Sequence, residues 1–293
     1  MFQHTKYYFI RDGNWRLWVL PDRWSRELWG EIVDRIGDQI PAERPRTLRF
    51  SFTSGDEEND FYLKIFGRPD LLGSLKDLVR HSKALRALRQ GEAFSRCGFH
   101  VPLAVAAGEE RTLGVLKRAF LLTRGISGSA LPYFLREYYA SPLDPGRVRR
   151  KRKYIRQLAL EVRRLHEIGF VHGDLVPYNI LVHAQGGQPS FFYLDHDRTQ
   201  RYPNWFPQAF WKRNLVQLNR FVLPGISLQD RIRFLRHYLG VDDQPWGKKQ
   251  KRLARWLEQK TRKRRAEYVP GGADLSFRKL MRWDESSTKN TEY

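Results

Sequence analysis

Residues 164–182 read RLHEIGFVHGDLVPYNILV, and this stretch decides the fold. Residues 147–168, which run into the start of this stretch, predict a helix, because apolar side chains recur there on one stripe. Gly169 ends the helix. Two apolar residues then lead into His172-Gly173-Asp174. Asn179 follows shortly after, and the run Ile180–Val182 predicts a strand. The pattern therefore places polar, reactive side chains on a loop between a long helix and a short strand.

This loop resembles the catalytic loop of the protein-kinase-like superfamily, which reads H-x-D-x-x-x-x-N between a helix and a strand. Phosphoryl transfer needs a carboxylate that orients the attacking hydroxyl and accepts its proton, and a second group that holds a metal ion near the phosphates. The resemblance implies the first role for Asp174 and the second for Asn179. We interpret His172 as a residue that braces the loop rather than one that takes part in the chemistry.

A second motif follows a predicted strand over Phe191–Leu194 and reads Asp195-His196-Asp197. Its setting resembles the kinase D-F-G motif, whose aspartate binds the magnesium ion that bridges the nucleotide phosphates. Asp195 keeps that role, whereas His196 stands in place of phenylalanine and Asp197 in place of glycine. Two interpretations of Asp197 remain open, a second metal ligand and a carboxylate that caps the loop.

The N-terminal half is expected to supply the groups that grip ATP. Lys64 lies in the middle of a predicted strand, Phe61–Phe66, like the kinase V-A-I-K lysine, and Glu92 on the following helix is its expected partner. Lys117, on a later strand, is the competing lysine. No G-x-G-x-x-G loop is present, and the turn after Ser54-Gly55 is acidic instead.

The elements along the chain predict an α+β fold with two lobes, divided near residues 125–130. Residues 1–125 are expected to form an N-lobe with a five-stranded antiparallel sheet and one main helix over 71–96. The turn Gly108-Glu109-Glu110 is expected to separate two of its strands. Residues 126–293 are expected to form a mainly helical C-lobe that carries the catalytic loop, Asp195 and a basic C-terminal helix, with ATP between the lobes.

Composition excludes several classes of protein. The chain has 293 residues, 41% of them hydrophobic and 14% aromatic, so it can bury a core and is not wholly disordered. Its one cysteine, Cys97, rules out an intrachain disulfide framework and a multi-cysteine zinc site. No apolar run is long enough for a membrane helix, and the first residues do not have the pattern of a secretory signal.

The net charge of +21 indicates an anionic partner. Most of it comes from two stretches: residues 147–164 hold nine basic and one acidic residue, and residues 248–265 hold ten and one. This concentration favours a binding surface over two solvated helix faces, but it does not identify the anion.

Within the superfamily, the chain resembles the lipopolysaccharide kinases, which phosphorylate Kdo or heptose. The segment after Asp195 is too short for a platform that docks a protein substrate, and it lacks an A-P-E motif. The Asp-x-Asp motif is followed by Arg198. The predicted helix at 211–220 and the high basicity of the chain also agree with this family. The resemblance implies the cofactors ATP and Mg²⁺ and a lipid A–core precursor as acceptor. It also implies a cytoplasmic protein, peripheral to the inner membrane, whose two basic stretches contact the anionic lipid surface. We expect no specific nucleic acid.

Two alternatives remain open. The first is another kinase on the same fold, acting on a small molecule or a protein. The second is an inactive basic scaffold that binds membrane or nucleic acid, which the missing glycine-rich loop and the D-H-D motif would allow. The retention of Lys64, Asp174, Asn179 and Asp195 favours an enzyme over the scaffold.

Overall fold

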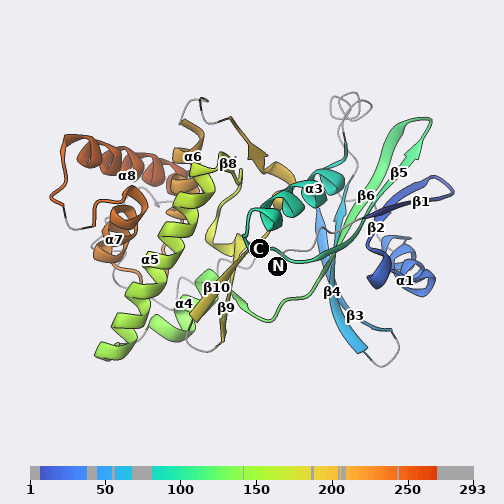
Figure 1. Cartoon of the computed structure of the whole chain (residues 1–293), viewed down its shortest axis with the longest axis horizontal. Helices are drawn as coiled ribbons and strands as arrows, with labels where there is room; N and C mark the ends of the chain where they lie inside the picture. The colour runs from blue at the N-terminus through green and yellow to red at the C-terminus, as the bar shows by residue number, and fades with distance from the viewer. Residues whose placement is uncertain are drawn as a thin grey trace. The chain divides into compact units, whose positions relative to one another are not determined.

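The computed structural model describes residues 7–37, 45–54, 57–67, 81–140, 142–185, 188–203, 205, 209–242 and 244–268. It has an α+β fold of two compact units (Figure 1). The first unit comprises residues 1–127 together with Phe192–Thr199, and the second comprises 128–191 with 200–293. The segment that carries Asp195 therefore groups with the first unit, whereas the sequence-based division placed it in the second. The reason is that this segment packs on a helix of the first unit.

The first unit is built on a six-stranded antiparallel sheet in the order β1-β2-β5-β6-β4-β3. Its strands are β1 (Tyr8–Asp12), β2 (Trp15–Val19), β3 (Arg46–Ser54), β4 (Glu57–Phe66), β5 (Ala104–Thr112) and β6 (Val115–Arg124). Its helices in the described residues are α1 (Arg26–Gly37), α3 (Lys83–Arg96) and the short 3-10 turns η1 (Pro21–Arg23) and η3 (His196–Arg198).

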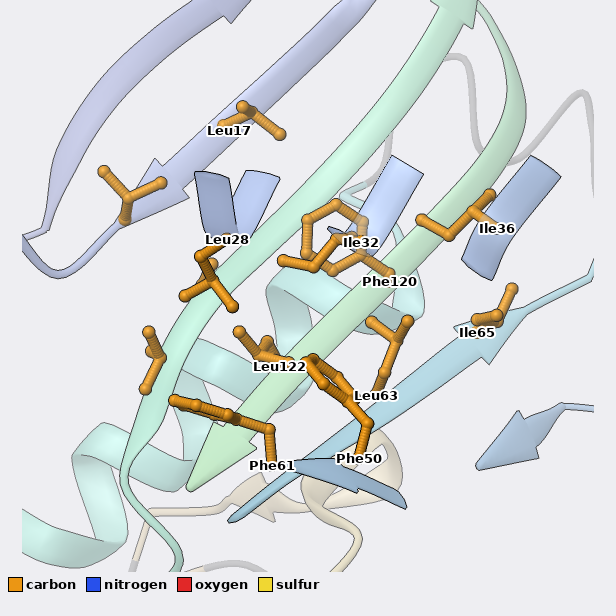
Figure 2. Close-up of a cluster of buried hydrophobic side chains, with 13 residues drawn as sticks. Leu17, Leu28, Ile32, Ile36, Phe50, Phe61, Leu63, Ile65, Phe120 and Leu122 are labelled. Atoms are coloured by element: carbon orange, nitrogen blue, oxygen red, sulfur yellow. The ribbon is translucent and has the colours of Figure 1, made fainter. Parts of the chain in front are cut away.

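The helix α1 covers one face of this sheet. Ser25 caps its N-terminus by accepting a hydrogen bond from the backbone N–H of Leu28 at 3.1 Å. Leu28, Ile32 and Ile36 recur at helical spacing and are buried against apolar strand residues (Figure 2). These strand residues include Leu17, Phe50, Phe61, Leu63, Phe120 and Leu122. Alternation along β4 therefore turns Leu63 and Ile65 toward α1 and Lys64 toward the opposite face.

The helix α3 packs on that opposite face, where Leu85 and Leu88 contact Ala107 of β5. Its N-terminus is capped by Ser82, whose side chain accepts from the backbone N–H of Leu85 at 3.2 Å. The expected helix began at residue 71, and residues 71–80 lie outside the described part of the chain. Lys64 and α3 consequently share one side of the sheet.

Three expectations for this unit were wrong. The sheet has six strands rather than five, because the N-terminal hairpin joins it through β2 and β5. Gly108–Glu110 lies inside β5 rather than in a turn, because Gly108 leaves room for the Phe120 ring and Glu109 is buried. The turn instead lies at Leu113-Gly114, where both residues have positive φ. The acidic residues after Ser54-Gly55 were expected to form a turn, but from Glu57 onward they belong to strand β4.

The second unit is mainly helical. Its helices are α4 (Leu131–Tyr139), α5 (Pro145–Glu167), α6 (Ala209–Leu218), α7 (Leu228–Leu239) and α8 (Lys248–Tyr268). Its short strands and 3-10 turn are β7 (Ser129–Ala130), β8 (Phe170–Val171), η2 (Pro177–Asn179), β9 (Ile180–Gln185), β10 (Gln188–Tyr193) and β11 (Gln200–Arg201). Asp144 caps α5 and Pro145 opens it, and the apolar stripe of α5 packs on α7. Among the described helices, none is both long and apolar enough to cross a membrane.

Candidate active site

The predicted catalytic loop is a compact turn at the end of α5. Gly169 and Gly173 have φ angles of 88° and 81°, so each bends the chain where other residues would be strained. The side-chain nitrogen Nδ2 of Asn179 donates to the carbonyl oxygen of Asp174 at 2.9 Å, and this bond closes the loop. The backbone N–H of Asn179 also donates, to Val176 at 2.9 Å. Asp174 and Asn179, which the sequence predicted as a pair, are thus held together.

Two amide side chains of α6, those of Asn214 and Gln217, form hydrogen bonds with the backbone of this loop, and neither was predicted from the sequence. Gln217 donates from Nε2 to the carbonyl of Gly173 at 2.8 Å, and its Oε1 accepts from the backbone N–H of Leu175 at 3.2 Å. It therefore grips the backbone on both sides of Asp174. Asn214 accepts from the backbone N–H of His172 at 3.0 Å and donates to Gln217 at 2.9 Å.

A partly buried histidine extends this network. The Nε2 atom of His166 lies 3.1 Å from Oδ1 of Asn214, and its Nδ1 lies 2.9 Å from the hydroxyl of Tyr238. Burial lowers the pKa of His166 to about 4, so the ring is neutral at physiological pH. A neutral ring has one N–H, which it donates to one of these two oxygens. His172 is fully buried, in keeping with the bracing role expected of it.

In the first unit, Lys64 lies against Asp195. Its Nζ atom is 2.5 Å from Oδ1 of Asp195, and both side chains are partly buried. Asp195 adopts φ 64° and ψ 64°, a left-handed conformation that is uncommon for a residue with a side chain and that recurs at functional sites. The competing lysine, Lys117, lies near the start of β6, and Lys64 is the lysine that meets Asp195.

The expected ion pair between Lys64 and Glu92 is not formed. Within the described residues, Glu92 instead pairs with Arg96, one turn along α3, at 3.4 Å. Its other carboxylate oxygen, Oε1, is buried and has no hydrogen-bond partner in that part of the chain. Burial raises the pKa of Glu92 above its ordinary value. The expectation failed because Asp195 lies within 2.5 Å of the Lys64 ammonium group and forms the ion pair that was expected of Glu92.

The histidine of the D-H-D motif is a packing residue. His196 is 6% exposed and its ring lies 4.7 Å from that of Phe94 on α3. Its Nε2 lies 2.9 Å from the carbonyl oxygen of Tyr193, and its Nδ1 lies 3.3 Å from the hydroxyl of Thr199. Burial lowers its pKa to about 4, so it stays neutral. A histidine can therefore fill an apolar position next to Asp195 because both ring nitrogens have partners.

Asp197 lies beside Asp195 in an unfavourable charge environment. Burial first, and then the charge of Asp195, raise the pKa of Asp197 to about 6. Within the first unit, the carboxylates of Asp195 and Asp197 offer oxygen atoms, which magnesium prefers. Magnesium needs only one or two protein carboxylates because substrate phosphates and water complete its shell. This donor set suits magnesium, although no cluster of three or more acidic, histidine or cysteine residues occurs in the described part.

The acidic start of β4 is partly neutralised. Asp60 accepts hydrogen bonds from Arg49 and Ser51, each at 2.7 Å, and these bonds lower its pKa. Glu57 pairs with Arg23 at 3.5 Å. Residues 55–56, at the tip where a glycine-rich loop would lie in kinases, fall outside the described part of the chain. The hairpin itself is regular up to the pair of Ser54 and Glu57.

Comparison with known proteins gives the family. Among solved structures, the chain is similar to "WaaP in complex with acyl carrier protein", with a TM-score of 0.54, 21% identity, and coverage of 82% of this chain and 95% of that chain. It also matches the PknI kinase domain of Mycobacterium tuberculosis and the Rio2 kinase of Chaetomium thermophilum in complex with ADP, Mg²⁺ and phosphoaspartate. The first has a TM-score of 0.39 and 12% identity over 74% of this chain and 94% of that one. The second has 0.39 and 13% over 89% and 82%.

No curated protein sequence is significantly similar to the chain. The model of the lipopolysaccharide kinase (Kdo/WaaP) family, however, matches residues 56–238, which include Lys64, Asp174, Asn179 and Asp195. With its protein-kinase-like fold, this protein belongs to the lipopolysaccharide kinase (Kdo/WaaP) family.

Proposed function

We propose that this protein is an ATP-dependent kinase that transfers the γ-phosphate to a sugar hydroxyl, on Kdo or heptose, of the lipopolysaccharide inner core. The observation that carries the proposal is the catalytic loop, in which Asn179 is fixed to Asp174 and Gln217 holds the backbone on both sides of that carboxylate. A scaffold without catalytic function does not require a carboxylate held in this way.

Each residue has a definite task in this reaction. Asp174 accepts the proton of the sugar hydroxyl as that oxygen attacks the γ-phosphorus atom, and the bond from this phosphorus to the bridging oxygen of the β-phosphate breaks, so that ADP leaves. Asn179 and Asp195 hold magnesium, which when bound neutralises charge on the phosphates. Lys64 binds the α- and β-phosphates. Lys64 Nζ lies 2.5 Å from Asp195 Oδ1, so the group proposed to bind phosphate and the group proposed to bind magnesium are held next to each other.

The direct test is incubation with γ-labelled ATP, Mg²⁺ and a lipid A precursor that bears Kdo. Label is expected to enter the lipid with the unaltered protein and not with Asp174→Asn or Asp195→Asn, provided that both variants show a cooperative thermal transition. Full transfer by either variant would refute these roles. If no label moves but Mg-ATP raises the melting temperature, the protein is a kinase with another acceptor; if neither occurs, the scaffold alternative holds.

We also propose that the protein is peripheral to the cytoplasmic face of the inner membrane. Seven basic residues on α5 are exposed: Arg147, Arg149, Arg150, Arg152, Lys153, Arg156 and Arg164. Nine on α8 are exposed too: Lys248, Lys249, Lys251, Arg252, Arg255, Lys260, Arg262, Lys263 and Arg264. Each contributes about 1 kcal/mol near an anionic bilayer. Sedimentation with anionic vesicles, but not with neutral ones or with DNA, is the expected result; equal binding to DNA would contradict it.

An acyl chain is a further candidate ligand of the second unit. A cavity of about 590 Å³ lies among α4, α5, α6, α7 and α8, and its lining is mostly apolar, with Phe134, Leu158, Leu235 and Leu257 among its residues. Arg255 and Arg262 also line it. Since the similar WaaP was solved with acyl carrier protein, we propose that an acylated carrier protein binds here. Acylated carrier protein is expected to raise the melting temperature more than its unacylated form, and Leu235→Trp to abolish the difference. Equal shifts would contradict the proposal.

A further inference from the structure

Two exposed tyrosines stand side by side at the catalytic loop, and neither has a role in the function proposed so far. Tyr178 belongs to η2, between Asp174 and Asn179, and is 38% exposed. Tyr133 lies in the first turn of α4 and is 56% exposed. Their ring centroids are 5.9 Å apart, with the ring planes inclined at 75°. Exposed aromatic rings that contact each other from distant parts of the chain are typical of binding sites.

The loop geometry fixes Tyr178 in this position. Its neighbours on both sides are anchored: Pro177 is buried, and Asn179 is bonded to the carbonyl of Asp174 at 2.9 Å. The Tyr178 ring also makes an edge-on contact with Phe221, at 5.4 Å between centroids and 89° between planes. A tyrosine held from two sides loses little conformational entropy when a ligand binds. Tyr178 is therefore preorganised rather than a freely moving surface residue.

The position of this pair decides what it can bind. A hydroxyl that transfers its proton to Asp174 must come within hydrogen-bond distance of that carboxylate. Tyr178 lies between Asp174 and Asn179 on the same short loop, and the Asn179 side chain donates to the backbone carbonyl of Asp174, so the Tyr178 ring belongs to the loop that a reacting hydroxyl has to approach. The pair is thus placed for the acceptor.

The chemistry of the pair suits a sugar. A tyrosine ring has an apolar face that packs on the C–H groups of a pyranose, and a hydroxyl that bonds the sugar's own hydroxyls. Arg136 lies one turn after Tyr133 on α4 and is exposed, and the neighbouring exposed Glu137 is hydrogen-bonded to Tyr138, which leaves the positive charge of Arg136 to accompany the pair. An anionic sugar, bearing a carboxylate or a phosphate, is complementary to this combination, whereas an apolar chain would leave the tyrosine hydroxyls and Arg136 without partners.

We propose that Tyr133 and Tyr178 form the binding subsite for the acceptor sugar ring, with Arg136 selecting an anionic sugar. This inference rests on the proposed kinase function and specifies which residues recognise its substrate. Both tyrosines contact the sugar directly; neither transfers a proton.

The test uses a deacylated, water-soluble core oligosaccharide that bears Kdo, so that membrane and acyl-chain contacts do not contribute. Steady-state kinetics and calorimetric titration with this acceptor are measured for Tyr133→Ala, Tyr178→Ala and the double variant. We expect the acceptor KM to rise about 3- to 10-fold in each single variant and about 10- to 100-fold in the double variant. Tyr133→Phe and Tyr178→Phe, which keep the ring, are expected to restore most of the affinity.

Tyr138→Ala is the matched control. Tyr138 is also on α4 and is 46% exposed, and its ring packs on Phe134 of the same helix rather than on Tyr178. The variant is expected to keep the acceptor KM of the unaltered protein. Melting temperatures establish that each variant is folded. Arg136→Gln is expected to weaken an anionic acceptor more than a neutral sugar of the same size.

The outcomes separate this inference from the function on which it rests. If the unaltered protein phosphorylates no sugar acceptor, the proposed function fails. If it does so, but the folded double variant has an unchanged acceptor KM and dissociation constant, the tyrosine subsite is wrong while the kinase function stands. A loss equal in Tyr138→Ala and Tyr178→Ala would also overturn it, because the effect would then not be specific to the pair.

Discussion

Replacing Gln217 by alanine tests whether the support beneath the catalytic loop serves the reaction or only the fold. The substitution removes three hydrogen bonds: to the carbonyl of Gly173 at 2.8 Å, from the N–H of Leu175 at 3.2 Å, and from Asn214 at 2.9 Å. A net value of about 0.5–1.5 kcal/mol for each of the three bonds gives a loss of about 1.5–4.5 kcal/mol in unfolding free energy. The loop that carries Asp174 then loses the bonds that Gln217 makes to Gly173 and Leu175, one on each side of Asp174.

The effect on catalysis should be separate from the effect on stability. A displacement of about 1 Å at a reacting group costs roughly 100-fold in rate, so we expect kcat to fall about 10- to 100-fold in Gln217→Ala. The measurement is steady-state kinetics well below the melting temperature, together with urea denaturation of the same preparations. Gln217→Glu should be impaired as well, because a carboxylate oxygen would face the Gly173 carbonyl in place of the amide donor.

Gln157→Ala is the matched control for this experiment. Its Nε2 donates to the backbone carbonyl of Pro189 at 2.8 Å in the same unit, so it makes the same kind of bond as Gln217 but away from the loop. It should lower the unfolding free energy without changing kcat. If Gln217→Ala lost stability but kept the kcat of the unaltered protein, the inference that this residue positions Asp174 would be refuted.

Three further predictions concern stability. The pKa of His166 is lowered from 6.5 to about 4, so the unfolded chain binds more protons between these values. The folded state should therefore lose about 3–4 kcal/mol as the pH falls through them, and His166→Gln should flatten that loss. Glu109→Ala should cost about 3–5 kcal/mol, since it leaves the buried Arg111 guanidinium without its carboxylate at 2.9 Å. Ser227→Ala should cost about 1 kcal/mol, because it breaks the capping box with Asp230 that begins α7.

Each of these predictions is checked by chemical denaturation. For His166, the free energy of unfolding is measured at several pH values, and parallel curves for the two proteins would contradict the assignment. For Glu109, a double-mutant cycle with Arg111→Met isolates the pair, and a coupling near zero would show that burial of the pair is not what stabilises the strand. For Ser227, a glycine variant should lose only a few tenths of a kcal/mol relative to serine, and an equal loss in both variants would exclude a capping effect.

The parts of the site that could be predicted are those whose pattern is local. Asp174 and Asn179 are separated by a short, fixed spacing, and a helix end and a strand frame them, so their shared loop could be read from the sequence. The proximity of Lys64 and Asp195 could be expected only through the family resemblance, since the two lie on elements far apart in the chain.

Other features depend on tertiary contacts that a sequence pattern does not reveal. Asn214 and Gln217 contact the loop across more than forty positions, and the one signal in the sequence was the presence of two amide residues, three positions apart, within an otherwise apolar run of α6. Glycine and two glutamates at 108–110 favour a turn locally, but burial of Glu109 by Arg111 and Ser82 keeps them in β5. Glu92 was expected to meet Lys64 because its spacing suits that partner, and the nearer charge of Asp195 prevails.

Arg265 of α8 is bonded to the backbone just after α6, and these bonds can form only once α8 has been synthesised. Arg265 of α8 is buried and donates to the carbonyls of Arg220 at 2.8 Å and Asn219 at 2.9 Å, so it anchors the helix that carries Gln217. A ribosome adds roughly 5–20 residues per second, so Asp174 leaves the exit tunnel several seconds before Arg265 does. During that interval Asp174, the proposed catalytic base, lies on a loop whose supporting helix is not yet anchored by Arg265, and a translation pause before α8 would lengthen the interval.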